Sequence, residues 1–137
     1  MAFTTASIDL TAPPDHVWRL IGGFDSLPDW LPFIRTSTVT EGGRIRHLTT
    51  TTGDQISERL ESFDEDSRTY TYTFLQSPFP VTNYHATLTV HETPDPQKSQ
   101  VEWSATFTPT EADDDAVALV NSIFTNGLNA LKQTLDS

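Results

Sequence analysis

Residues 101–137 read VEWSATFTPTEADDDAVALVNSIFTNGLNALKQTLDS, and the spacing of the apolar residues changes once within this stretch. In VEWSATF every second residue is apolar, which is typical of a strand with one buried face. From Ala116 on, apolar residues recur at every third or fourth position, and this spacing predicts a single helix of about 25 residues, from about Glu111 to Leu135. The chain therefore ends with a long amphipathic helix that needs an apolar sheet face to cover.

Upstream of this stretch, alternation predicts six strands between about Ile34 and Phe107. Short turns rich in Gly, Pro and Asp separate the strands, so sequential hairpins form an antiparallel meander. Phe3 to Leu10 predicts a further strand, and two short proline-containing helices are expected within residues 12–32. This order predicts an α+β fold in which a curved, seven-stranded antiparallel sheet wraps around the C-terminal helix.

Composition excludes several classes of protein. The 137 residues show no linker or repeat and predict one domain spanning 1–137, and the absence of cysteine excludes thiol chemistry and cysteine zinc sites. The net charge of −11 disfavours nucleic acid and anionic membranes as partners. No basic segment precedes an apolar one at the N-terminus, and no apolar run approaches the length of about 20 residues that spans a bilayer. We therefore expect a cytoplasmic protein with no membrane partner.

Three consecutive predicted strands carry polar side chains on faces that should be buried. Alternation in QISERLESF places Glu58 inward, and RTYTYTFL places Tyr70 and Tyr72 inward. The alternation of RIRHLTTT leaves two choices, and we place Arg46 inward because a buried carboxylate needs a cation or donor. A hairpin around Gly53 then brings Arg46 close to Glu58. Polar groups on an inner face predict that these strands line a cavity.

Each of these features also has a purely structural interpretation. The Arg46–Glu58 pair either anchors the polar end of a ligand or only fixes strand register. Inward Tyr84 and Trp103, like Tyr72, are either cavity walls or ordinary core. Outside these strands, Trp30 and Pro32 would sit near a cavity mouth, and the loop with Phe79 and Pro80 is either a gate or only a turn.

Catalytic and metal motifs are scarce. Serine nucleophile elbows, phosphate-binding glycine loops and dinucleotide fingerprints are absent, and Glu58 has no second inward carboxylate to share acid–base work. An adjacent arginine would keep Glu58 ionised and weakly basic, although Glu58, Tyr72 and Tyr84 remain candidates for proton transfer. The four histidines lack the spacing of a helical metal site, so we expect no metal and no cofactor.

Several segments in fixed order carry a resemblance to a known superfamily. They are APPDHVWRLI, FDSLPDWLP, RIRHLTTTTGDQISERLESFDEDSRTYTYTF, PFPVTNYHATLTV, VEWSATF and GLNALK. Their order and spacing, over nearly the whole chain, resemble the START-like helix-grip (SRPBCC) superfamily, and most of all its bacterial polyketide cyclase/dehydrase-like or lipid-transport-like subgroup. The resemblance implies a helix-grip fold, and fold alone does not fix function.

Two main hypotheses for function follow. The first is a binding module for a small hydrophobic or amphipathic molecule with one polar end, held between the sheet and the C-terminal helix. The second is a cyclase, dehydratase or related enzyme acting on a polyketide or aromatic substrate; a partner-binding domain and a homodimer are left open. The few inward polar groups favour binding. The predicted ligand-binding residues are Trp30, Pro32, Arg46, Glu58, Tyr72, Tyr84, Trp103, Phe107, Leu119, Ile123 and Gly127.

Overall fold

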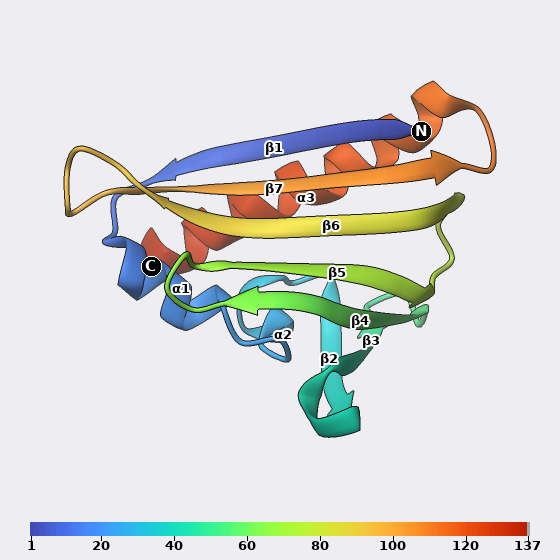
Figure 1. Cartoon of the computed structure of the whole chain (residues 1–137), viewed down its shortest axis with the longest axis horizontal. Helices are drawn as coiled ribbons and strands as arrows, with labels where there is room; N and C mark the ends of the chain where they lie inside the picture. Colours follow the sequence, from blue (N-terminus) through green and yellow to red (C-terminus); the bar gives the residue numbers. More distant parts are fainter. Residues whose placement is uncertain (137) are drawn as a thin grey trace.

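The structure is a computed structural model that describes residues 1–136, apart from the side chain of Asp113. Figure 1 shows a long helix lying along one face of an extended sheet, with two short helices near one end. The elements are β1 (Ala2–Leu10), α1 (Pro14–Ile21), α2 (Leu27–Trp30), β2 (Ile34–Thr40), the 3₁₀ turn η1 (Glu41–Gly43), β3 (Ile45–Thr50), β4 (Gln55–Asp64), β5 (Thr69–Gln76), β6 (Val81–Glu92), β7 (Ser99–Pro109) and α3 (Asp113–Asp136).

All seven strands belong to one antiparallel sheet in the order β1-β7-β6-β5-β4-β3-β2. Strands β2 to β7 are neighbours in chain order, and β1 pairs with β7, so the first strand lies beside the last. The predicted α+β class, seven-stranded sheet and two short helices between the first two strands are confirmed. The long helix starts at Asp113, two residues after the predicted Glu111, and the predicted domain end at Ser137 lies outside the described residues.

The core lies between the sheet and α3. Alternate residues of β7, from Val101 to Phe107, are buried, and so are Ala116, Val120, Phe124 and others on one face of α3. The rings of Trp103 and Phe124 stack with centroids 4.5 Å apart. Burial of one strand face and one helix stripe against each other is the main stabilising interaction of this layer arrangement.

Four irregularities in strand pairing interrupt the sheet. Arg35 in β2, Glu61 in β4, Leu75 in β5 and Asn83 in β6 each stand as an extra residue where the register shifts. Asn83 adopts a positive φ of 51°, a conformation that asparagine tolerates better than most residues. Such bulges bend a strand and increase its twist, which lets the sheet curve around α3. They also change which residues face inward, since Val81 and Tyr84, three positions apart, both pack on the core side.

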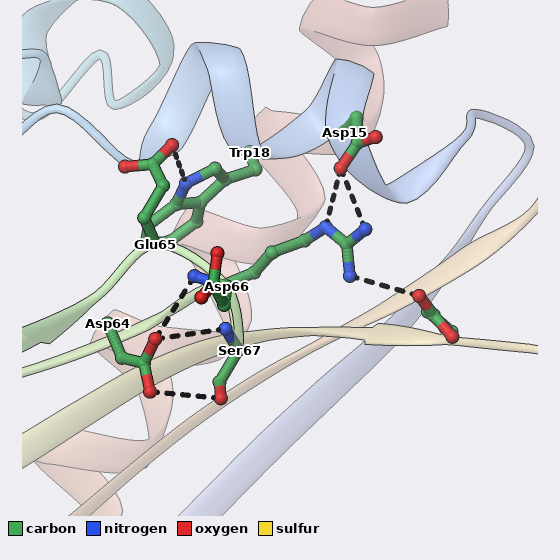
Figure 2. A network of polar contacts seen from close by, with 8 residues as sticks. Asp15, Trp18, Asp64, Glu65, Asp66 and Ser67 are labelled. Carbon is green, nitrogen blue, oxygen red and sulfur yellow. Dashed lines mark hydrogen bonds and ion pairs between the residues drawn. The ribbon is translucent and has the colours of Figure 1, made fainter.

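Polar contacts hold α1 against the β4–β5 turn (Figure 2). This turn lies at the opposite end of β5 from the β5–β6 loop. Arg68 donates to Asp15 of α1 at 2.8 Å, and the Trp18 indole nitrogen donates to Glu65 at 3.0 Å. Asp64 accepts three hydrogen bonds from Asp66 and Ser67, and the two bonds from Ser67 are the main reason that the pKa of Asp64 is lowered.

No helix within the described residues is both long and apolar enough to cross a membrane.

Candidate functional site

Two neighbouring hollows lie beside α3, the first between α3 and the sheet and the second between α3 and the α2–β2 and β5–β6 connections. The first, called here the inner chamber, has a volume of about 40 Å³, and its polar lining is Arg46, Glu58, Tyr72 and Tyr84. The second, called the outer groove, has a volume of about 430 Å³ and an almost wholly apolar lining. The hollows share four wall residues, Leu31, Phe33, Phe79 and Ile123.

An ion pair lies in the wall of the inner chamber. Arg46 of β3 and Glu58 of β4 are directly opposite each other in the strand register, and the Arg46 Nε donates to Glu58 Oε1 at 2.6 Å. The exposed fractions of the two residues are 1% and 5%. This placement confirms the inward orientation predicted for Glu58 from alternation and for Arg46 from the need of a buried carboxylate for a cation. A distance this short is typical of a hydrogen bond between two charged groups.

The Arg46 guanidinium is surrounded by aromatic rings. Its central carbon lies 4.2 Å from the ring centroid of Phe24 and 4.7 Å from that of Tyr72. Its Nη1 donates to the Phe24 carbonyl at 2.9 Å and to the Tyr70 hydroxyl at 3.5 Å. Cation–π contacts and several hydrogen bonds therefore fix the cation in one position.

Burial shifts the pKa of the ionisable groups in the chamber. Burial raises the pKa of Glu58 above its ordinary value, although the charge of Arg46 and its hydrogen bond oppose this shift. Burial lowers the pKa of Arg46, but Glu58 and the phenols of Tyr70 and Tyr72 more than reverse this, so Arg46 stays protonated. The direction for Glu58 differs from the sequence-based expectation, because the complete burial of the carboxyl group outweighs its attraction to the arginine.

Aromatic side chains form the walls of the inner chamber. The Trp103 indole nitrogen donates to the Tyr72 hydroxyl at 3.0 Å. The rings of Phe74 and Tyr84 stack with centroids 3.9 Å apart and planes 13° apart. Burial raises the pKa of both Tyr72 and Tyr84, so both phenols remain neutral donors. The chamber thus combines one ion pair with flat aromatic walls.

The bulge at Asn83 determines where Tyr84 lies. Tyr84 follows two consecutive exposed residues, Thr82 and Asn83. The chain therefore turns inward at Tyr84. The Thr73 hydroxyl of the neighbouring strand donates to the Tyr84 carbonyl at 2.6 Å, next to the irregular pairing.

The outer groove runs along α3. Its lining from the helix is Leu119, Ile123, Asn126, Gly127 and Ala130. A Cβ atom on Gly127 would lie 2.9 Å from Cζ3 of Trp103 and 3.4 Å from Cδ1 of Leu31. The helix can therefore approach the chamber wall closely because position 127 has no side chain.

The structure brings together most, but not all, of the residues that the sequence analysis singled out. Arg46, Glu58, Tyr72, Tyr84, Trp103 and Ile123 line the inner chamber, and Pro32, Leu119, Ile123 and Gly127 line the outer groove. Trp30 and Phe107 line neither hollow. Both are buried core residues, and Trp30 packs against Trp103 with ring centroids 5.8 Å apart.

Several wall residues were not selected from the sequence. Phe74 continues the inward alternation of Tyr70 and Tyr72, so the same signal could have identified it. Leu31, Phe33 and Phe79 lie in connections between elements, where alternation gives no orientation. Within the described residues, no three His, Asp or Glu side chains gather as metal ligands.

Comparison with known proteins shows the family of this chain and its fold. The family model described as polyketide cyclase/dehydrase and lipid transport matches residues 1–136. An uncharacterised protein from Bacillus thuringiensis is 49% identical, with 99% of this chain and 100% of that chain covered and a TM-score of 0.97. The protein XoxI from Bacillus cereus is 53% identical, with 97% and 94% covered and a TM-score of 0.95.

A more distant structure shares the fold. The Zhui aromatase/cyclase from Streptomyces sp. R1128 is 16% identical, with 97% of this chain and 90% of that chain covered and a TM-score of 0.77. The resemblance noted in the sequence to the START-like helix-grip superfamily is confirmed by the family match and by the fold. The chain belongs to the polyketide cyclase/dehydrase and lipid transport family.

Proposed function

We propose that the protein binds a small, largely apolar molecule with one polar end in the space between the sheet and α3. The observation that carries this proposal is the buried Arg46–Glu58 pair in the wall of a chamber that is otherwise mainly aromatic and aliphatic. Buried charges are costly, and their presence beside a hollow supports a role in orienting a ligand.

The two hollows suit different parts of such a ligand. The outer groove, at about 430 Å³, is within the range of small-molecule sites, about 300–1,000 Å³. The inner chamber, at about 40 Å³, has room only for a small group. In the proposed complex the apolar body occupies the groove, and the polar end passes the shared wall at Phe79 and Ile123 to reach Arg46, Glu58 and the tyrosines.

Native mass spectrometry of the protein purified from its own host tests this proposal. We expect a fraction of the protein to carry one small molecule that is lost on denaturation. We also expect an uncharged fluorescent probe, N-phenyl-1-naphthylamine, to bind the emptied protein. If no co-purified molecule is detected and the probe does not bind, the proposed function is contradicted.

Proton-transfer catalysis is a second candidate, favoured by the raised pKa of Glu58 beside the hydroxyls of Tyr72 and Tyr84. A carboxyl group with a raised pKa can act as an acid nearer to neutral pH, as cyclisation and dehydration require. If this candidate is right, Glu58→Gln abolishes turnover of a polyketide-like ketone and leaves probe affinity nearly unchanged.

The cytoplasmic location, the absence of nucleic-acid and membrane partners, and the open question of a homodimer stay predictions.

A further inference from the structure

We infer that the polar end of the ligand carries no net charge, so that the site accepts a ketone or hydroxyl group and rejects a carboxylate of the same shape. This inference rests on the proposed binding function and narrows the chemical class of its ligand.

The first argument is the charge balance of the inner chamber. Arg46 and Glu58 are the only Arg, Lys, His, Asp or Glu residues among its described lining, and they neutralise each other at 2.6 Å. The remaining ionisable lining groups, Tyr72 and Tyr84, are neutral phenols. A ligand with a charged end would therefore bring an unbalanced charge into a buried site, which is strongly unfavourable.

The second argument concerns what Arg46 has left to offer an anion. Its Nε already donates to Glu58, and its Nη1 donates to the carbonyl of Phe24. The rings of Phe24 and Tyr72 lie over the guanidinium at 4.2 and 4.7 Å. The Nη2 group has no hydrogen-bond partner within the described residues, so a carboxylate could bind there, but only on the same guanidinium as Glu58, where the two negative charges repel each other.

The third argument is that an uncharged acceptor does find donors. The Tyr72 oxygen already accepts a hydrogen bond from Trp103, and Tyr84 supplies a second hydroxyl to the chamber. Even when the two phenols bond to each other, one hydroxyl hydrogen remains for a ligand oxygen. A carbonyl or hydroxyl group is also small enough for a chamber of about 40 Å³.

Two matched pairs of probes test the inference, because the members of each pair differ in charge and hardly in shape. They are 2-acetylnaphthalene against 2-naphthoate and 2-undecanone against decanoate, titrated calorimetrically at about pH 8, where both acids are ionised. We expect each ketone to bind at least about tenfold more tightly than its carboxylate. Equal or tighter binding of the carboxylates would overturn the inference and leave the binding function intact. If neither the ketone nor the carboxylate of either pair binds, both the inference and the proposed binding function are wrong.

Glu58→Gln supplies the internal test. The amide keeps the shape of the side chain and removes its negative charge, so it leaves the charge of Arg46 unbalanced. We expect the ratio of carboxylate to ketone affinity to rise by about tenfold or more in this variant. Glu61→Gln, on the same strand but exposed, should keep the wild-type ratio. An unchanged ratio in Glu58→Gln would overturn the inference, and the wild-type comparison stands by itself if that variant fails to fold.

Discussion

Arg46 and Glu58 are directly paired across β3 and β4, and their side chains form a buried ion pair with a separation of 2.6 Å between Nε and Oε1. The same two residues line the inner chamber. The pair therefore belongs both to the sheet and to the candidate site, and its energetics can be tested separately from ligand binding.

Removing the arginine alone should be costly. Arg46→Met leaves the Glu58 carboxylate buried without its cation, and we expect the free energy of unfolding at neutral pH to fall by about 3–5 kcal/mol. The double variant Arg46→Met/Glu58→Leu removes both charges and should be neutral or more stable than wild type, by up to about 4 kcal/mol. Urea denaturation measures both. If Arg46→Met leaves stability unchanged, the pair is solvated and not buried.

Stability should depend on pH through Glu58. Its pKa is raised in the folded protein from an ordinary value of 4.5. Between that value and the folded pKa, the folded state holds a proton that the unfolded state has released. The contribution of Glu58 is therefore greatest below the ordinary value and is lost as the pH rises through the folded pKa.

Glu58→Gln has no such proton, so the stability of wild type relative to this variant should decrease as the pH rises from about 4 to about 8. Urea denaturation of both proteins across this range measures the difference. An increase with rising pH would mean that Arg46 lowers the pKa of Glu58 and that attraction outweighs burial.

The sequence predicted the element order and the inward residues of regular strands, because alternation and helical spacing depend on near neighbours. Alternation placed Glu58 inward for this reason, whereas Arg46 was placed inward because a buried carboxylate needs a cation. It could not predict the bulge at Asn83, since one extra residue in a strand changes the register without a clear change in composition. It also could not separate Trp103, which lines the chamber, from Phe107, which does not, because tertiary packing decides which inward ring reaches a hollow.

The conformation of Asn83 gives a test of how Tyr84 is positioned. A β-branched residue at a φ of 51° is strained, so Asn83→Val should cost about 1–3 kcal/mol and weaken binding of N-phenyl-1-naphthylamine. Asn83→Gly permits the same conformation and should restore most of the probe affinity. Thr82→Val, next to it and exposed, serves as the control. Equal effects of the Val and Gly substitutions at Asn83 would show that the bulge does not position the chamber wall.

A substitution at Gly127 tests how closely α3 approaches Trp103. An alanine Cβ would meet the Trp103 ring at 2.9 Å, and overpacking of this kind typically costs about 1–3 kcal/mol. Alanine gains about 1 kcal/mol over glycine within a helix, so we expect a net loss of up to about 2 kcal/mol for Gly127→Ala. The exposed Asn129→Ala should be slightly stabilising. A stabilised Gly127→Ala in urea denaturation would mean that the ring moves aside freely.

The most direct test of a ligand site between the sheet and α3 is to fill it. Ile123 lies in the wall shared by the inner chamber and the outer groove, whereas Ser122, its neighbour on α3, is exposed. We expect Ile123→Trp to weaken binding of N-phenyl-1-naphthylamine by at least about tenfold, since the indole would occupy the space of the ligand. Ser122→Trp should bind the probe as wild type does. Equal probe affinity in Ile123→Trp and wild type, with both proteins folded, would contradict a binding site at this position.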